Sequence, residues 1–232
     1  MQKTTDVKEL VNDMFAAGAH RGFVRSRRHP SVAKYLHSTR SRKDIINLEE
    51  TANLLTKAEE FATTLGRLGK TLLFVATKPE AQAFMKAAAE KAGQPYATER
   101  WIGGTLTNLS EIKKRTAHYN TLRKQRDTNS LVYKTKKEKL MLEREIAKLE
   151  RNFHGVAEMD NVPDALFVID SGSEHNAVTE AMKLRIPVIA VSNTDCNISD
   201  IQYPVVANDT LITSVEYFVN RITDAYLAGK TS

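Results

Sequence analysis

Apolar residues along this chain follow two patterns, continuous runs and helical spacings, and the two patterns alternate. Continuous apolar runs at 71–76, 165–170 and 187–191 predict strands that are buried on both faces. Spacings of three and four residues predict helices, which cover 49–68, 79–92, 174–185 and 210–228. This alternation predicts an α/β fold with a doubly wound, mostly parallel sheet and helices on both faces.

Shorter patterns complete this architecture. Runs at 44–48, 94–100 and 203–206 predict short strands, and the spacing over 6–17 predicts an amphipathic helix. Thr5 is expected to cap that helix and Gly18 to end it. Ser173 and the pair Asn208 and Asp209 are expected to cap the later helices.

The segment 109–153 has a different pattern from the rest of the chain. One apolar seam is interrupted at Arg115 and Thr116, and a returning seam has heptad spacing. The two seams consist of Leu109, Ile112, Tyr119 and Leu122, then of Leu142, Ile146, Leu149, Phe153 and Val156. With a polar turn at 125–130 between them, they predict an antiparallel coiled-coil hairpin inserted into a globular domain of residues 1–108 and 154–232. Two ordinary surface helices are the alternative.

Composition narrows the class of protein. Of the 232 residues, 41% are apolar and 27% are charged, which is typical of a soluble globular protein. No apolar run approaches the length that spans a membrane, and the first residues lack a signal-peptide core. The one cysteine, Cys196, excludes an intramolecular disulfide and agrees with a reducing cytosol.

The distribution of charge says more than the net charge of +6. Residues 18–43 hold eight Lys or Arg and no Asp or Glu, while residues 100–151 hold fourteen basic and six acidic residues. These two segments together carry +16, so the rest of the chain carries −10. An acidic body with two basic segments favours a polyanionic partner over two solvated charged surfaces.

The basic segments supply the candidate contacts to phosphate. Residues 19–43 are expected to form a long basic loop that belongs, with the first helix, to the globular domain. The expected contacts in this loop are Arg21, Arg25, Arg27, Arg28, His29, Lys34, Arg40, Arg42 and Lys43. At the base of the hairpin they are Arg100, Lys113, Lys114 and Arg115. The outer lysines Lys134, Lys136, Lys137 and Lys139 either reach RNA or keep the hairpin soluble, and both readings stay open.

Catalytic and nucleotide-binding signals are weak. There is no Gly-x-Gly-x-x-Gly and no Gly-x-x-x-x-Gly-Lys-Ser/Thr, and the turn after 71–76 is Thr77-Lys78-Pro79. A triad of Ser171 or Ser173 with His175 and Asp195 lacks a nucleophile elbow. Asp195 and Asp209 could hold a hard cation, but their spacing is not diagnostic. We therefore predict no catalytic residues, no metal site and no cofactor. The rival hypothesis is an α/β enzyme or nucleotide-binding protein whose basic arm docks an acidic substrate.

Several motifs resemble the bacterial-type ribosomal protein S2 (uS2) family. Residues 100–108 read Arg-Trp-Ile-Gly-Gly-Thr-Leu-Thr-Asn, which resembles that family's RW-(hydrophobic)-GG-x-LTN stretch. Further similar stretches, in the family's order, are 45–51, 74–78 (Phe-Val-Ala-Thr-Lys), 163–170 (Pro-Asp-Ala-Leu-Phe-Val-Ile-Asp), 186–190 and 208–209. The likeness covers residues 7–229. Two stretches depart from it: 18–23 lacks the second histidine of GxHFGH, and 192–197 differs from VDTNxDP.

The resemblance implies a structural constituent of the small ribosomal subunit that supports translation and catalyses no reaction. It implies contact with 16S-type rRNA and neighbouring ribosomal proteins at the neck between head and body, and in many bacteria with the mRNA-binding protein S1. It implies a cytoplasmic or organellar ribosome, with no membrane and no small-molecule substrate. Trp101 is expected to pack inside the domain, with Arg100 contacting RNA. Exchanging Arg27 and Arg28 for Glu is expected to reduce incorporation into subunits and to leave the fold intact.

Overall fold

A five-stranded parallel sheet forms the centre of the computed structural model, which describes residues 2–128, 130, 133 and 135–231. The strand order is β5-β4-β6-β7-β8. These strands are β4 (Leu72–Val75), β5 (Tyr96–Ala97), β6 (Ala165–Ile169), β7 (Val188–Ser192) and β8 (Tyr203–Val206). Every residue of β4, β6 and β7 is buried, which is why these segments read as continuous apolar runs. The predicted fold class is confirmed.

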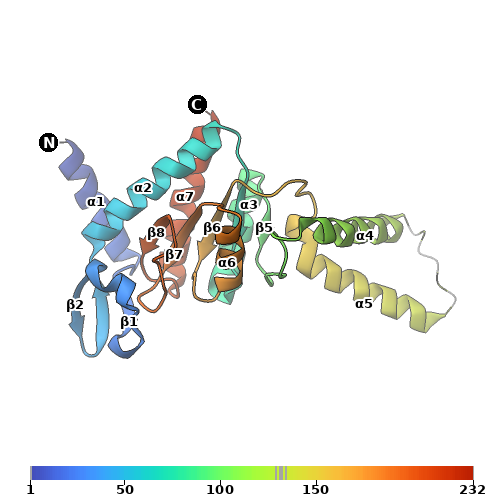
Figure 1. The fold of residues 1–232 in the computed structure, drawn as a ribbon, viewed down its shortest axis with the longest axis horizontal. Coiled ribbons are helices and arrows are strands. Elements are labelled where there is room, and N and C mark those ends of the chain that lie inside the picture. Colours follow the sequence, from blue (N-terminus) through green and yellow to red (C-terminus); the bar gives the residue numbers. More distant parts are fainter. Residues whose placement is uncertain (1, 129, 131–132, 134, 232) are drawn as a thin grey trace.

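Alternate strand residues enter two separate cores, one on each face of the sheet. On the first face, Phe74, Phe167 and Ile189 pack with residues of α2 (Leu48–Arg67), α3 (Pro79–Ala92) and α7 (Ile212–Thr231). On the second face, strand residues pack with α6 (His175–Lys183), Trp101 and the base of a helical arm. Helices therefore lie on both faces of the sheet (Figure 1).

Two of these helices approach each other through glycine. A Cβ on Gly66 of α2 would lie 2.0 Å from the carbonyl oxygen of Tyr226, and one on Gly229 of α7 would lie 2.0 Å from that of Thr63. Only residues without a side chain permit this backbone approach. The sequence pattern marked both helices but did not show their close crossing.

Three expected helix caps are wrong. The first helix, α1 (Gln2–Ala16), begins before Thr5, so Thr5 is not its N-cap, although Gly18 follows its end with a φ of 78°. The turn before α6 is held by the Asp170 carboxylate, which accepts the backbone N–H groups of Gly172 and Ser173. Before α7, the Asn208 side chain accepts from the backbone N–H groups of residues 210 and 211, while Asp209 faces the protein interior.

The basic segment 19–43 is an ordered structure rather than a loop. It contains β1 (Arg21–Val24), β2 (Leu36–Arg40) and two 3₁₀ turns, η1 (Arg25–Arg27) and η2 (Pro30–Tyr35). With β3 (Lys43–Ile46), these strands form an antiparallel sheet of order β1-β3-β2, which we name the small sheet. Its strand residues are mostly exposed, so no apolar alternation announces them. Val32 and Ile46 join it to the second core.

Two helices, α4 (Leu109–Asp127) and α5 (Lys136–Phe153), form the arm. They extend away from the parallel sheet at the end of the molecule opposite the small sheet (Figure 1). Five residues of the predicted seams are buried in these helices: Ile112, Tyr119, Leu122, Ile146 and Phe153. Leu109, Leu142 and Leu149 are half-buried. Thr116 is also buried and therefore continues the first seam instead of breaking it. Ile112 and Phe153 belong to the second core and root the arm in the globular part.

The ends of the arm helices differ slightly from the prediction. Residues 125–127 still belong to α4, so the expected turn at 125–130 begins later, and residue 129 lies outside the described part. The start of α5 is a capping box between Thr135 and Glu138. Lys134 also lies outside the described residues. None of the described helices is long and apolar enough to span a bilayer.

Candidate nucleic-acid interface

The small sheet carries most of the predicted phosphate contacts on its surface. Within the described chain, six of its cationic side chains are exposed and have no ion pair. These are Arg21, Arg25, Arg27, Arg40, Arg42 and Lys43. Unneutralised arginine and lysine side chains on one surface attract a phosphate backbone.

Hydrogen bonds from elsewhere in the chain fix the small sheet to the globular domain. Thr194, in the loop after β7, accepts the backbone N–H of Phe23 on its hydroxyl at 3.0 Å and that of His29 on its carbonyl at 2.9 Å. Asn208 donates its side-chain amide to the carbonyl of Arg21 at 2.7 Å. The backbone that carries the cations is therefore fixed to the globular domain.

Arg28 differs from the other arginines of this segment. Its guanidinium donates two hydrogen bonds to the buried carboxylate of Asp44, one from Nε at 2.7 Å, and a third to Thr39. The hydrogen bond from Arg28 lowers the pKa of the Asp44 carboxyl, although burial opposes the shift. The ion pair argues against the expectation that the double exchange of Arg27 and Arg28 leaves the fold intact, because the exchange would leave the buried Asp44 carboxylate without its partner.

His29 and Lys34 also have partners inside the small-sheet region. The Nδ1 atom of His29 lies 2.8 Å from the Ser31 hydroxyl and accepts the Ser31 backbone N–H, which caps η2. The Lys34 ammonium lies 4.8 Å from the centre of the Tyr35 ring. Both residues stay predicted RNA contacts, with part of their polar surface already in use.

The turn between β2 and β3 has an unusual backbone. Ser41 and Arg42 form a two-residue connection, and both have positive φ, at 49° and 63°. Asn and Gly are the usual residues of such a turn. This strained turn projects the Arg42 side chain from the tip of a hairpin that also carries Arg40 and Lys43.

The second predicted group lies at the base of the arm. Arg100, Lys113, Lys114 and Arg115 are all exposed, and Lys114 is paired with Glu111 at 2.6 Å. The structure does not bring this group together with the small sheet, since the parallel sheet lies between the small sheet and the base of the arm (Figure 1). A partner that meets both must extend across the molecule.

The stretch that contains Trp101 is organised around a carboxylate on α6. Glu180 accepts hydrogen bonds from Trp101 Nε1 at 3.0 Å and from the backbone N–H groups of Gly104 at 2.8 Å, Leu106 at 3.0 Å and Thr107 at 3.1 Å. Burial alone would raise the pKa of Glu180, but these hydrogen bonds lower it. Trp101 is buried, as expected. Glu180 holds the loop from which the arm starts.

Sequence reasoning missed Glu180, although a signal was present. In α6, Ala177, Val178 and Ala181 are buried, and Glu180 falls on the same face. A carboxylate on the apolar face of a short helix must have hydrogen-bond donors nearby, because a buried unpaired charge is too costly. That reasoning predicts a partner for Glu180 but does not identify it.

The place where α/β folds bind ligands is occupied here by the chain's own side chains. Successive strands are added on opposite sides of β4, so the strand order reverses between β4 and β6. Lys78 and Asp170 follow these two strands. The Lys78 ammonium lies 2.5 Å from Asp170 and 3.2 Å from Asp209, whose other oxygen accepts from the Asn193 amide. Although burial opposes it, the two carboxylates raise the pKa of Lys78. An internal ion-pair network fills this crevice.

Asp195 and Asp209 do not come together as a possible cation site, because the structure gathers a different set. Among the described residues, Asp170, Cys196 and Asp209 have ligand atoms within 4.8 Å of one another, while Asp195 is exposed. Lys78 already supplies positive charge to both carboxylates of this set. Burial, followed by the nearby carboxylates, raises the pKa of the Cys196 thiol, so the thiol stays protonated at neutral pH.

The serines considered for catalysis have other partners. The Ser173 hydroxyl donates to Asp170 at 2.6 Å, and the Ser171 hydroxyl lies 2.8 Å from that of Ser192. His175 Nδ1 lies 3.3 Å from the Gly172 carbonyl. In the described chain these residues therefore do not form the hydrogen-bonded relay that a Ser–His–Asp triad requires.

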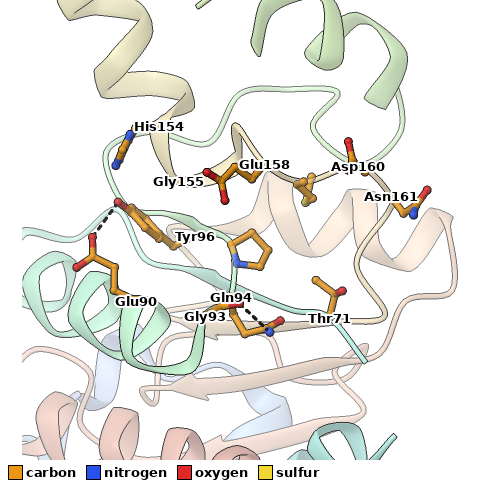
Figure 2. Close-up of a pocket in the computed structure, with 12 residues that line it drawn as sticks. Thr71, Glu90, Gly93, Gln94, Tyr96, His154, Gly155, Glu158, Asp160 and Asn161 are labelled. Atoms are coloured by element: carbon orange, nitrogen blue, oxygen red, sulfur yellow. Dashed lines mark hydrogen bonds between the residues drawn. The ribbon is translucent and has the colours of Figure 1, made fainter. Parts of the chain in front are cut away.

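A pocket at the base of the arm has the opposite charge from the small sheet. Figure 2 shows Glu90, Glu158 and Asp160 around it, with Tyr96 and His154 at one side. Burial, followed by the charge of Glu90, raises the pKa of Tyr96 to about 12, and its hydroxyl donates to Glu90 at 3.3 Å. Carboxylates at the wall disfavour phosphate, so this pocket is not part of the candidate interface.

Comparison with known proteins identifies the family of this chain. The family model described as "Ribosomal protein S2" matches residues 14–229. The small ribosomal subunit protein uS2 of Nocardia farcinica is 38% identical over 219 residues, which cover 94% of this chain and 77% of that protein. The uS2 protein of Coprothermobacter proteolyticus is 38% identical over 223 residues, covering 95% of this chain and 82% of that protein. The chain therefore belongs to the ribosomal protein S2 family, whose members are structural proteins and not enzymes.

Proposed function

We propose that this chain is a structural constituent of the small ribosomal subunit and binds 16S-type rRNA through two basic surfaces. One surface is the small sheet and the other is the base of the arm. The proposal places the protein at the neck between head and body, in contact with neighbouring ribosomal proteins, in a cytoplasmic ribosome. Family membership supports the ribosomal assignment, and the electrostatics of the two surfaces support RNA as the direct partner.

The observation that carries the RNA proposal is the set of unpaired cations on the small sheet. If this segment served only to pack against the globular domain, we would expect its charged side chains to form ion pairs, as Arg28 does with Asp44. Instead, Arg25, Arg27 and Arg42 lie in turns and form no salt bridge in the described chain. Arginine binds phosphate with two parallel hydrogen bonds, so each of them can contact a backbone phosphate.

The acidic remainder of the chain also supports RNA binding at the two basic surfaces. Because the net charge outside the two basic segments is −10, the rest of the surface repels RNA and restricts it to the two basic surfaces. The ion pairs of Lys78 with Asp170 and Asp209 are the observation against the rival α/β enzyme, because they engage within the chain the charged side chains that follow β4 and β6, where this fold would bind a nucleotide.

Sedimentation of a cell lysate on a sucrose gradient tests the proposal. The wild-type chain is expected to migrate with small subunits and with whole ribosomes at moderate salt. Replacing Arg25, Arg27 and Arg42 by Glu is expected to move most of the chain to the soluble fractions, because three phosphate contacts become repulsive. Arg28 stays in place in this variant so that Asp44 keeps its partner.

A matched control reverses three exposed lysines outside the two basic surfaces, Lys8, Lys57 and Lys183. This control changes the net charge by the same amount and is expected to stay with the subunits. Normal incorporation of the arginine variant would remove the small sheet from the RNA interface. A wild-type chain found only in the soluble fractions would contradict the ribosomal proposal itself.

A further inference from the structure

A pocket of about 480 Å³ lies between the small sheet and the carboxyl edge of the parallel sheet. Arg21 and Phe23 of β1 and Arg40 of β2 line it, together with Lys43 and Asp44 of β3. Loops that follow β7 and β8 form the opposite wall. The pocket therefore exists only because two segments far apart in the sequence come together.

The charge of this pocket is positive. Arg21, Arg40 and Lys43 have no ion pair among the described residues. The one acidic side chain in the wall, Asp44, is already neutralised by Arg28 and accepts a further hydrogen bond from Thr39 at 2.8 Å. Arg28 thus keeps the pocket cationic without facing a ligand itself.

Most amide groups in the wall are used for structure. Asn208 donates to the Arg21 carbonyl, and Asn193 donates to Asp209 at 3.0 Å. His20 is different: its ring stacks on Phe15 with centroids 4.4 Å apart, and its Nδ1 atom is buried with no hydrogen-bond partner. A buried polar atom without a partner in a native protein calls for an explanation, and an unbound ligand is one.

We propose that this pocket binds one unpaired nucleotide of the rRNA. Arg21, Arg40 and Lys43 contact its phosphates, and its base enters beside Phe23 and His20. Proteins bind single-stranded RNA by combining a cationic groove with aromatic surfaces for the bases, and this pocket has both. The proposal rests on the RNA-binding function above and adds the kind of nucleotide that is recognised.

The surroundings favour an RNA strand over a free nucleotide. The backbone N–H of Arg25 donates to the carbonyl of Arg42, so these exposed arginines lie next to each other beside the pocket. They continue its positive charge along the surface of the small sheet, where the phosphates before and after the bound nucleotide would lie. A free mononucleotide has no neighbouring phosphates that could contact these arginines.

Photo-crosslinking in assembled subunits tests the proposal. The photoreactive residue p-benzoylphenylalanine replaces Phe23 in the full chain, small subunits are purified and irradiated, and the crosslinked partner is mapped. The expected result is a crosslink to a single, unpaired rRNA nucleotide. The same residue at Lys183, on α6, is the control and is expected to give no such crosslink.

The outcomes separate this proposal from the proposed function. Subunits that contain the chain but give no rRNA crosslink at position 23, or only a crosslink to a paired stem, would overturn the pocket proposal alone. A crosslink to a free mononucleotide would overturn the assignment to an RNA strand. Absence of the wild-type chain from subunits would overturn the proposed function.

Two substitutions provide a second test that does not depend on the photoreactive residue. Phe23→Leu keeps an apolar side chain but loses the ring, and it is expected to weaken rRNA binding about 5- to 100-fold. His20→Phe keeps an aromatic ring against Phe15 and removes the unpaired nitrogen. Its melting temperature is expected to stay equal or rise, while binding to rRNA falls. If His20→Phe is less stable and binds RNA normally, His20 has a structural role and the pocket proposal fails.

Discussion

The small sheet and the arm are both basic, but they hold their charges in different ways. On the small sheet, Arg25, Arg27 and Arg42 form no salt bridge in the described chain. On the arm, some cations are paired within or between the helices: Arg123 with Asp127, Arg126 with Glu150, and Lys139 with Glu143. Exposed pairs of this kind add little stability but reduce the charge that a phosphate would meet.

Their attachment to the globular domain differs as well. The small sheet is tied by hydrogen bonds to loops at the carboxyl edge of the parallel sheet and by the buried Arg28–Asp44 pair. The arm starts from the loop that Glu180 holds and is rooted by Ile112 and Phe153. The comparison teaches that charge density alone does not define an RNA-binding surface. Under the proposal above, cations without an ion pair on a fixed backbone are the better candidates, because they bind phosphate without first breaking an ion pair.

The largest effect is expected at the anchor of the arm. Glu180→Ala leaves Trp101 Nε1 and three backbone N–H groups without an acceptor in a buried site. We expect the free energy of unfolding to fall by about 3–5 kcal/mol, in the range found for broken buried hydrogen-bond networks. Urea denaturation followed by the fluorescence of the single tryptophan measures it.

Glu111→Ala on the exposed surface of α4 is the control and should change the unfolding free energy by less than about 0.5 kcal/mol. Because hydrogen bonds lower the folded-state pKa of Glu180, its stabilisation is present above the ordinary carboxyl pKa and is lost as the pH falls through the folded value. Equal stability of the Glu180 and Glu111 variants would show that the arm does not depend on this carboxylate.

The second prediction separates neighbouring arginines on the small sheet. Arg28→Ala leaves the buried Asp44 carboxylate unpaired and is expected to lower the unfolding free energy by about 2–4 kcal/mol. Arg27→Ala removes an exposed cation and is expected to leave the unfolding free energy within about 0.5 kcal/mol of wild type. Denaturation of both variants at neutral pH measures the difference.

The pH dependence sharpens the same prediction. The hydrogen bond from Arg28 lowers the folded-state pKa of Asp44, so the pair stabilises the fold above the unfolded carboxyl pKa of about 3.9 and this contribution disappears at lower pH. The gap between wild type and Arg28→Ala should therefore narrow on acidification. A gap that stays constant down to pH 2 would argue against the ion pair as its cause.

The third prediction compares the two surfaces directly in RNA binding. Changing Arg25, Arg27 and Arg42 to Ala is expected to reduce the salt dependence of rRNA binding, the slope of log K against log salt, by about 2 to 3. Changing Lys136, Lys137 and Lys139 on α5 should reduce it by less than about 1, because Lys139 is paired and α5 lies outside the two proposed RNA-binding surfaces. Filter binding at several salt concentrations gives both slopes, and the reverse order would make the arm the principal RNA-binding surface.

The smallest effect is expected at the turn between β2 and β3. Arg42→Gly relieves a positive φ and is expected to raise the unfolding free energy by about 1 kcal/mol while weakening RNA binding. Gly93→Ala is the reverse substitution and serves as the control, because Gly93 also has a φ of 63° and an added Cβ would contact no neighbour. That exchange should cost about 1 kcal/mol through backbone strain alone. A destabilised Arg42→Gly would show that the turn is not strained.

Local patterns in the sequence already determined much of this protein. Buried runs such as 165–169 identify strands of a parallel sheet, since each strand shows its burial in its own residues. The helix 79–92 was predicted with the bounds that the structure has, because Pro79 and Gly93 mark its two ends locally. The two basic segments were also visible, because charge density is a property of the sequence alone.

Only the tertiary structure decided how individual charged residues are used. Arg27 and Arg28 are equivalent in the sequence, yet only Arg28 pairs with Asp44. This pairing depends on how the strands of the small sheet assemble, and the exposed strand β2 has no apolar alternation that would predict that assembly. Glu180 and Gly104 are 76 residues apart, and Lys78 and Asp209 are 131 apart. Such pairs are set by the order of strands in the sheet, and hydrogen bonds across those separations leave no periodic signal in the sequence.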